Sequence, residues 1–288
     1  MSPVAIVSDT THSMPPDVVA ASGATQISLY VSDGTGERKE SDITDLDAFY
    51  GRMREGGSLP TTSQPSVGDL LAVYDPLVAA GHDVVSMHIS GELSGTVSAA
   101  QQAAEEIAKR GHGPRVEVID SRGACSQLGL AVLAAAASAR GGAEIDVVTA
   151  RAREASERVR MLWTLDSLDH LRRGGRIGAA QALLGGALKI KPILSVDGAI
   201  IPVDRVRTWG RALDRLGSYL QTRLDEGAGT WVVQHIQLPD EAERLVERGR
   251  EIMGSEPLFV SEVGAVVGTH LGPGMLGVCT APPELFAE

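Results

Sequence analysis

Aromatic side chains are scarce in this sequence: Phe, Trp and Tyr together make up 3% of its 288 residues. Proteins that bind single-stranded nucleic acids stack the bases on exposed aromatic rings, so the composition argues against that function. The net charge of −11 disfavours nucleic acids and anionic membranes, which attract positively charged surfaces. We therefore expect no nucleic-acid partner, although a local basic patch would still allow transient contact with a membrane.

Cysteine is nearly absent, and the only two present, Cys125 and Cys279, are far apart in the sequence. A structural zinc site or a disulfide framework needs several closely spaced cysteines, so we expect neither. Long hydrophobic runs are missing too, because the longest, residues 128–139, is too short to span a bilayer. The chain does not start with a basic segment followed by an apolar one, as a secretory signal would. These absences predict a soluble cytoplasmic protein with free thiols.

The first half of the chain alternates between short apolar runs and segments with helical periodicity. This alternation predicts a parallel β-sheet with helices on both faces. The expected strands are residues 4–7, 26–31, 83–89 and 115–120, and the expected helices are residues 16–22, 46–55, 96–110 and 127–140. A further helix should begin at Ser66, because Ser66 and Asp69 resemble a capping box. Asp9, Ser90 and Asp120 then lie at strand ends, on the sheet edge where ligands bind in such folds.

The second half of the chain has a different pattern. Residues 189–196 and 199–206 flank Asp197-Gly198, which predicts a hairpin with a type I′ turn. Further strands are expected at residues 230–237 and 257–264, and helices at residues 210–224 and 239–253. We therefore predict an α/β fold with an N-terminal parallel-sheet α/β domain, residues 1–158. A C-terminal α+β domain with a mixed or antiparallel sheet, residues 159–288, follows without a linker, so a site between the domains is natural.

Three segments far apart in the sequence are rich in hydroxyls, glycine or histidine. They are Thr61-Thr62-Ser63-Gln64-Pro65-Ser66, Ser90-Gly91-Glu92-Leu93-Ser94-Gly95-Thr96 and Gly268-Thr269-His270-Leu271-Gly272-Pro273-Gly274. Neutral hydrogen-bond donors at helix N-termini can hold a small anion such as a carboxylate without a metal. The rest of the chain is apolar enough to bury a long tail behind such a head group. The combination suggests a site for a lipid acid.

Each of these segments also has a purely structural interpretation. Ser94 precedes a predicted helix, so its hydroxyl could bind an anion or simply cap the helix. Thr62 precedes the helix at Ser66 and could likewise be a cap or turn residue. His270 lies in a glycine-rich turn after the strand-like residues 264–267, where it could donate to a carboxylate, act as a base or be structural. The residues alone leave these alternatives open.

Basic residues gather in two places on this acidic chain. Residues 171–177 carry three arginines, including Arg172, and Arg205 and Arg207 lie at the end of the predicted hairpin. Such patches are either solvated positive surfaces or docking sites for a phosphate or a protein partner. Residues 272–277 match G-x-G-x-x-G, but the chain ends too soon for the strand–helix unit of a dinucleotide site. The sequence contains no Walker A motif, so it shows no ATP-binding machinery of its own.

Several short segments, distributed over nearly the whole chain, occur in an order that resembles one known family. They are V-S-D-T-T (residues 7–11), T-S-Q-P-S (62–66), L-S-G-T (93–96), V-I-D-S (118–121), L-R-R-G-G-R-I (171–177), I-K-P-I-L (190–194), and G-T-H with G-P-G (268–274). Taken together and in this order, they resemble the DegV family of fatty-acid-binding proteins. The resemblance implies a two-domain α/β fold with a long-chain fatty acid buried between the domains, and no other cofactor or metal.

The resemblance also implies roles for single residues. In that family the fatty-acid carboxylate is held by a threonine and a serine that correspond to Thr62 and Ser94, and a histidine near the head group corresponds to His270. One departure concerns the residues before L-S-G-T, where the family often has two adjacent serines. This sequence has Gly91-Glu92 after Ser90 instead, and a carboxylate there would repel the ligand unless it faces solvent.

A protein partner is implied in the same way. Characterised members of the family are not enzymes themselves but present the bound acid to a separate fatty acid kinase, which forms an acyl phosphate for phospholipid synthesis. An arginine after the hairpin is linked to the kinase reaction, and Arg207 or Arg205 corresponds to it. Arg172, in the other basic segment, is a further candidate for contact with the kinase or with phosphate.

Two other classes of function stay open. A lipid-ester hydrolase would use Ser94 as nucleophile and His270 as base, with Asp9 or Asp120 orienting the histidine. A regulatory lipid-sensing protein would bind the acid but have no kinase partner.

Overall fold

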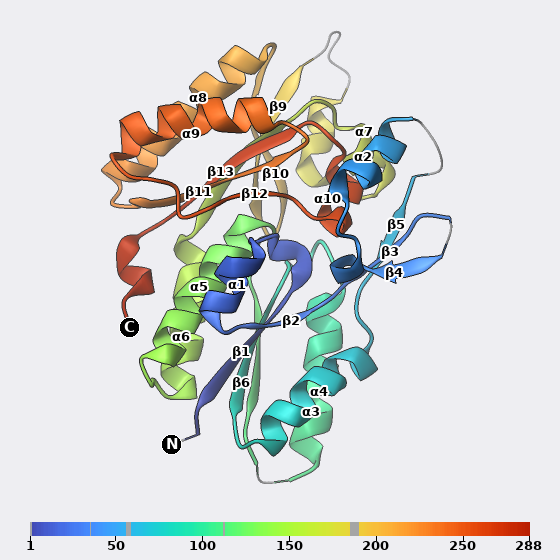
Figure 1. Ribbon diagram of the computed structural model, residues 1–288, viewed down its shortest axis with the longest axis vertical. Coiled ribbons are helices and arrows are strands. Elements are labelled where there is room, and N and C mark those ends of the chain that lie inside the picture. Colours follow the sequence, from blue (N-terminus) through green and yellow to red (C-terminus); the bar gives the residue numbers. More distant parts are fainter. Residues whose placement is uncertain (1, 35, 56–58, 112, 185–189) are drawn as a thin grey trace.

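Three β-sheets organise the chain in the computed structural model, which describes residues 2–34, 36–55, 59–111, 113–184 and 190–288. Figure 1 shows a parallel sheet in the lower part of the molecule, a larger mixed sheet in the upper part, and a small sheet at one side. In the part of the chain that the structure describes, no helix is long and apolar enough to cross a membrane.

The parallel sheet has four strands in the order β2-β1-β6-β7. They are β1 (Val4–Asp9), β2 (Thr25–Ile27), β6 (Asp83–His88) and β7 (Val116–Asp120). All neighbouring strands are parallel, as the alternation of apolar runs and helices predicted. Their carboxyl ends meet at one edge, which carries Asp9, Ser90 and Asp120 and faces the rest of the molecule.

Helices cover both faces of the parallel sheet. On one face, α3 (Val67–Ala79) and α4 (Thr96–Lys109) pack around Val7 and Val84. On the other face, α5 (Ser126–Arg140) and α6 (Ile145–Arg158) pack around Ile6 and Val85, while α1 (Pro16–Ser22) lies against α5. The predicted capping box is confirmed at the start of α3, where the Ser66 hydroxyl accepts from the Asp69 N–H at 3.1 Å and the Asp69 carboxylate accepts from the Ser66 N–H at 2.8 Å.

The mixed sheet has six strands in the order β10-β9-β8-β13-β11-β12. They are β8 (Arg160–Leu165), β9 (Lys191–Asp197), β10 (Ala199–Val206), β11 (Thr230–Ile236), β12 (Val260–Glu262) and β13 (Met275–Ala281). Only β11 and β12 are parallel neighbours, so the prediction of a mixed sheet is confirmed. The amphipathic helices α8 (Trp209–Asp225) and α9 (Pro239–Met253) cover one face, and the other face packs toward α5.

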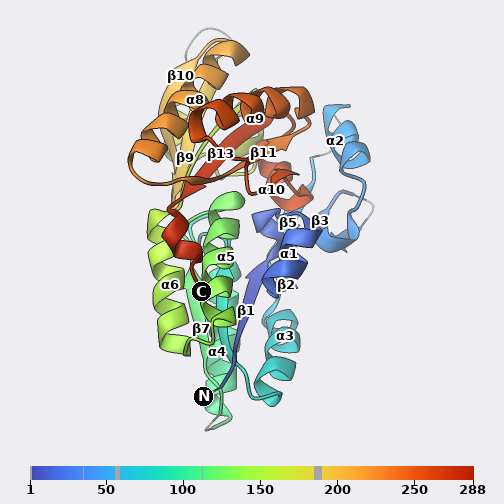
Figure 2. The ribbon, with the colours of Figure 1, turned by 60° about the vertical axis from the view of Figure 1, so that its left-hand side comes forward.

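A small antiparallel sheet, absent from the prediction, stands beside α2 (Leu46–Arg54) and α10 (Ala265–Leu271) in Figure 2. Its strands, in the order β4-β3-β5, are β3 (Tyr30–Ser32), β4 (Glu37–Lys39) and β5 (Thr61–Ser63). The strand predicted at residues 26–31 is therefore wrong, because β2 and β3 belong to different sheets. The chain turns at Leu29, whose carbonyl accepts from the Ser28 hydroxyl at 2.8 Å and from the Glu40 N–H at 2.8 Å.

Three further local predictions are wrong. The structural alternative for Thr62, a cap or turn residue, is wrong, because residues 61–63 pair with β3 as strand β5. The strand-like residues 264–267 begin α10 instead, whose backbone N–H at Val266 is held by the buried Glu40 carboxylate at 2.8 Å. His270 therefore lies in the last turn of a helix rather than in a loop. The strand expected at residues 257–264 is shortened to β12 (Val260–Glu262), and its last residue, Gly264, is the N-cap of α10.

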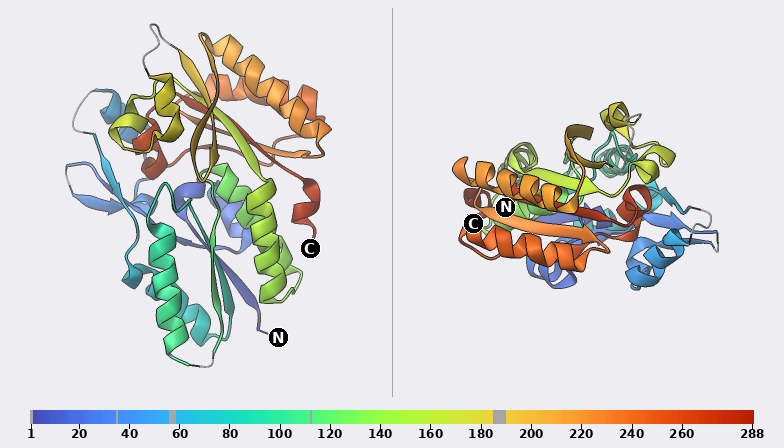
Figure 3. Two further views of the ribbon diagram at one scale, coloured as in Figure 1. Left: turned by 180° about the vertical axis from the view of Figure 1, so that it is seen from behind. Right: turned by 90° about the horizontal axis from the view of Figure 1, so that it is seen from above.

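The hairpin of β9 and β10 is confirmed from residue 191 onward, while the predicted first residue, Lys189, lies outside the described residues. Its turn is not type I′, which needs a positive φ at both central residues. Only Gly198 has one, at 75°, and Asp197 already pairs with Ala199. Figure 3 shows the hairpin reaching from the mixed sheet toward the loops of the parallel sheet. There the Ser90 hydroxyl donates to the Gly198 carbonyl at 2.6 Å.

Replacement of Gly198 by alanine should loosen this contact between the two sheets. A Cβ would force an L-residue into a left-handed conformation and lie 2.4 Å from the Glu92 carboxylate. We expect a loss of about 1–2 kcal/mol in the free energy of unfolding, measured by urea denaturation. The control is Gly210→Ala, where φ is not positive and no atom lies within 4 Å of the added Cβ. Equal stability of both variants would contradict the prediction.

Candidate functional site

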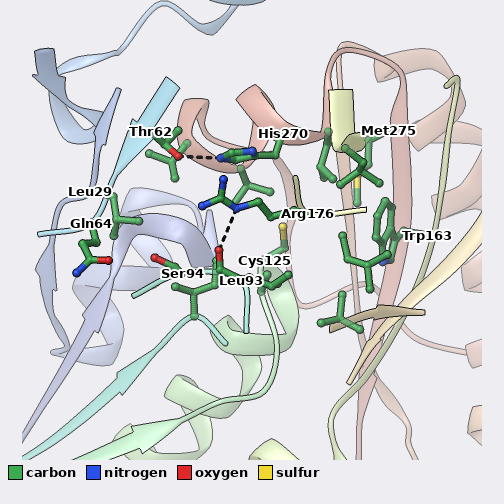
Figure 4. A pocket seen from close by; sticks show the side chains of 18 of the residues that line it. Leu29, Thr62, Gln64, Leu93, Ser94, Cys125, Trp163, Arg176, His270 and Met275 are labelled. Atoms are coloured by element: carbon green, nitrogen blue, oxygen red, sulfur yellow. Dashed lines mark hydrogen bonds between the residues drawn. The ribbon is translucent and has the colours of Figure 1, made fainter. Parts of the chain in front are cut away.

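A cavity of about 240 Å³ lies where the three sheets meet. Its walls are mainly apolar and come from all parts of the chain, including Leu29 after β2, Trp163 on β8, Ile200 on β10, Val266 on α10 and Met275 on β13. One end is polar, and Figure 4 shows Thr62, Ser94, Arg176 and His270 gathered there. An apolar chamber with a few polar groups at one end suits an amphiphile with a small polar head.

Thr62 and His270 meet at the polar end although they are 208 residues apart. The Thr62 hydroxyl, on β5, and Nε2 of His270, on α10, are 2.7 Å apart and share a hydrogen bond (Figure 4). Burial, with a smaller contribution from the positive charge of Arg176, lowers the pKa of His270 to about 4. The imidazole is therefore neutral near pH 7, and the pair presents neutral hydrogen-bonding groups rather than a charge.

Ser94 lies between β6 and α4 and lines the same end of the cavity. Its hydroxyl is 2.9 Å from that of Thr96 and receives a long hydrogen bond of 3.4 Å from the Thr96 N–H. The N-cap of α4 is Gly95, which leaves the helix without a side-chain cap. A Cβ on Gly95 would lie 1.9 Å from the Gln64 side-chain oxygen, so only glycine lets Gln64 cover this helix end. Ser94 is thus not the N-cap residue, but its hydroxyl stands beside the N-terminus of α4 and accepts from the N–H of Thr96, the first residue of that helix.

Arg176 is the cation of the polar end, and no sequence pattern singled it out. It follows α7 (Asp169–Arg173), its Nη1 donates to the Gly174 carbonyl at 2.7 Å, and its Nε donates to the Leu93 carbonyl at 3.3 Å. In Figure 4 the guanidinium lies between the Thr62–His270 pair and Ser94. The basic segment at residues 171–177 contains it, but the pattern does not say which of the three arginines lines the cavity.

The other predicted arginines lie elsewhere. Arg172, Arg205 and Arg207 are exposed, and none of them lines the cavity. Arg172 is 3.6 Å from the carboxylate of Asp169, its neighbour on α7. These positions suit contact with another molecule better than contact with a ligand in the cavity.

Glu92, the unexpected carboxylate beside L-S-G-T, does not line the cavity. The side chain is exposed and lies against the hairpin turn, where its Oε1 would meet a Cβ on Gly198 at 2.4 Å. Arg122 approaches the same position and pairs with Asp197 at 3.0 Å. The negative charge of Glu92 is therefore kept away from the polar end.

The catalytic arrangement of the hydrolase alternative is not assembled. Asp9 accepts a hydrogen bond from His88, not from His270, with 3.1 Å between the carboxylate and Nδ1. Asp120 accepts from the backbone N–H groups of Gly91 and Arg122. Ser94 bonds with Thr96 rather than with His270. Ser94 and His270 thus have neither the mutual contact nor the orienting carboxylate that nucleophilic catalysis needs.

A different series of hydrogen bonds, from Asp9 through His88 to Ser86, does exist, but it is buried in the protein interior. Nε2 of His88 is 2.8 Å from the Ser86 hydroxyl, which in turn accepts from the Tyr74 hydroxyl at 2.7 Å. Asp9, Tyr74, Ser86 and His88 each have 0% of their surface exposed. A substrate cannot reach this serine, so these hydrogen bonds link β1, β6 and α3 rather than performing chemistry.

Metal and thiol chemistry find no support at this site. No group of three or more His, Cys, Asp or Glu residues that could hold a metal ion occurs within residues 2–34, 36–55, 59–111, 113–184 and 190–288. Cys125 and Cys279 are both free and buried, as expected. Cys125 lines the cavity, but burial raises the pKa of its thiol well above the usual range, so the thiol is neutral.

The model of a known family matches residues 3–283, nearly the whole chain, and describes its members as uncharacterised proteins of the DegV family. The chain belongs to the DegV family. A DegV domain-containing protein of Clostridium acetobutylicum is 36% identical to this DegV protein over 277 residues, which cover 96% of each chain.

Two solved structures resemble this DegV protein over their full length. One is a DegV family protein from Thermus thermophilus, described by its fatty-acid binding, with 30% identity and a TM-score of 0.87 over 97% of this chain and 99% of that one. The other is DegV from Bacillus subtilis, described as a fatty acid binding protein, with 32% identity and a TM-score of 0.84 over 98% and 99% of the two chains. The predicted family and the predicted α/β fold are confirmed.

Proposed function

We propose that this DegV protein binds a long-chain fatty acid, with the acyl tail in the apolar cavity and the carboxylate at Thr62, Ser94 and His270. The supporting observation is the convergence of these three residues at the single polar end of an otherwise apolar cavity. Arg176 supplies a positive charge that complements the carboxylate. In this proposal residues 1–158 and 159–288 are two domains that enclose the ligand between them.

The two ends of the ligand contribute differently to its affinity. Each buried methylene contributes about 0.8 kcal/mol, so a tail of about 15 methylenes contributes roughly 12 kcal/mol before ordering costs. A hydrogen bond to the charged carboxylate contributes about 1.5–3 kcal/mol. The tail therefore dominates the affinity, while the polar end fixes the orientation of the acid.

Native mass spectrometry of the purified protein, followed by extraction and identification of the bound molecule, tests this function. We expect one fatty acid per chain. A ligand-free mass that persists after incubation with several long-chain acids would overturn the proposal.

We further propose that the protein presents the bound acid to a separate kinase, with Arg205 and Arg207 contributing to the docking surface. Both arginines are exposed near the end of β10, outside the cavity, where a partner can reach them without displacing the ligand. Arg172, exposed on α7, is a further candidate for contact with the kinase or with phosphate, and it lies in the same basic segment as Arg176.

Replacement of Arg207 by alanine should separate binding from presentation. We expect fatty-acid affinity within about twofold of the parent, because the residue lies outside the cavity, and acyl-phosphate formation with the kinase reduced at least tenfold. Arg153→Ala, at an exposed position on α6, is the control and should behave as the parent in both assays. Full activity of Arg207→Ala with the kinase would contradict the assignment of Arg207 to the docking surface, whereas a parent protein that supports no acyl-phosphate formation would favour a lipid sensor without this partner.

A further inference from the structure

Glu40 is a buried carboxylate, with 7% of its surface exposed, that connects two walls of the cavity. Its backbone N–H donates to the carbonyl of Leu29 at 2.8 Å. One carboxylate oxygen accepts from the Thr10 hydroxyl, and the other accepts from the Val266 N–H at 2.8 Å. Leu29 and Val266 both line the cavity, one beside the small sheet and the other on α10.

The contact of Glu40 with Val266 lies on the same helix, α10, that carries His270 at the polar end of the cavity. Val266 is in the first turn of α10 and His270 in the last, four residues later. Glu40 thus holds the start of α10 against the segment around Leu29, and Thr62 on β5 holds its end through His270. In a helix this short, movement at the first turn shifts the imidazole as well.

We propose that Glu40 is a positioning residue for the carboxylate site: it holds α10 against the small sheet, and release of this contact is a step in fatty-acid exchange. The inference rests on the proposed fatty-acid binding. It identifies α10 as the wall of the cavity that opens and Glu40 as the residue that keeps this wall closed.

The groups that face Glu40 make the contact sensitive to pH. Burial raises the pKa of Glu40 to about 7, the hydrogen bonds from Thr10 and Val266 oppose this rise, and the charge of Asp9 adds to it. Tyr50 and Cys125, the other titratable groups close to it, are neutral because burial raises both of their pKa values. No Lys, Arg or His within the described residues forms an ion pair with Glu40.

The direction of the effect follows from which state holds the proton more tightly. In the closed state Glu40 is buried against α10, and in the open state this contact is released and water reaches the carboxylate. The closed state holds the Glu40 proton more tightly than the open state, because burial raises the pKa of Glu40. The closed state is therefore favoured most at low pH and loses that advantage as the pH rises toward about 7. Above that pH the carboxylate is ionised in both states, so the advantage changes no further.

The test is the dissociation rate of cis-parinaric acid, a fluorescent polyunsaturated fatty acid, from the full chain between pH 5.5 and pH 8. For the parent we expect an increase of about tenfold between pH 5.5 and 7.5, with a plateau above. Glu40→Gln keeps the acceptor for Val266 but cannot ionise, so its rate should stay flat. Asp42→Asn removes an exposed carboxylate two residues away and should follow the parent. A flat parent profile, or the same slope in Glu40→Gln, would overturn the inference.

Hydrogen exchange of the ligand-free protein separates this inference from the proposed function. If neither cis-parinaric acid nor the acids of the mass-spectrometry test bind the parent, the proposed function fails, but protection of the α10 amides can still be measured. After correction for intrinsic exchange, α10 of the parent should lose about tenfold in protection between pH 5.5 and 7.5, and α10 of Glu40→Gln should not. An equal loss in both proteins would show that Glu40 does not hold α10.

Discussion

Replacement of Gly268 by alanine is expected to destabilise this protein more strongly than replacement of Gly198. Gly268 lies in α10, and a Cβ there would sit 1.9 Å from the Tyr50 hydroxyl. Tyr50 cannot move aside, since it is fully buried and donates to the Val263 carbonyl at 2.6 Å. We expect a loss of about 3 kcal/mol or more in the free energy of unfolding, measured by urea denaturation.

The matched control is on the helix that carries Tyr50. A Cβ on Gly51, in the middle of α2, would meet no atom within 4 Å. Gly51→Ala should therefore stabilise the protein by about 0.5–1 kcal/mol, because alanine is the better helix former. A Gly268→Ala variant as stable as the parent would show that α10 and α2 are not in this close contact.

The second large effect concerns the polar end of the cavity. Thr62→Ala and Ser94→Ala should each weaken fatty-acid binding by about tenfold to a hundredfold, because each removes a hydrogen bond to a charged group. Binding should not be abolished, since the tail supplies most of the affinity. The measurement is a titration of each variant with one long-chain acid, in which binding is detected by calorimetry or fluorescence.

Two controls show whether the hydroxyls act on the carboxylate. Thr62→Ser keeps a hydroxyl at the same position, where Thr62 meets His270, and should bind the acid nearly as the parent does. The methyl ester of the acid lacks the charge, so the parent should bind it no better than Ser94→Ala binds the acid. Parent-like affinity of both alanine variants would remove Thr62 and Ser94 from the carboxylate site.

Most of the fold could be predicted because its two larger sheets are built from strong local signals. Apolar strands such as β1 and β6, separated by helices, specify a parallel sheet almost without further information. The errors occur where tertiary contacts outweigh local preference. Valines 266 and 267 favour a strand by composition, yet they begin α10, where Glu40 holds the first turn from a distant part of the chain.

The candidate site was only partly predictable for a related reason. Nothing local in the chain indicates that Thr62 and His270 touch, and only the order of motifs in a known family joined them. Arg176 was missed because three arginines share one short segment, and only the path of the chain after α7 brings this one to the cavity. Patterns in sequence identify the segment, whereas side-chain direction depends on the packed structure.

The position of β13 in the sequence determines at which stage of synthesis the cavity can form. This strand comes last in the chain but lies in the interior of the mixed sheet, between β8 and β11. The parallel sheet and the helices that cover both of its faces are complete by residue 158, so they can form early on a ribosome that releases the N-terminal part first. The mixed sheet must wait for residues 275–281, and α10 emerges just before them. A nascent chain truncated before α10 therefore lacks Val266, His270 and Met275 and cannot complete the walls of the cavity.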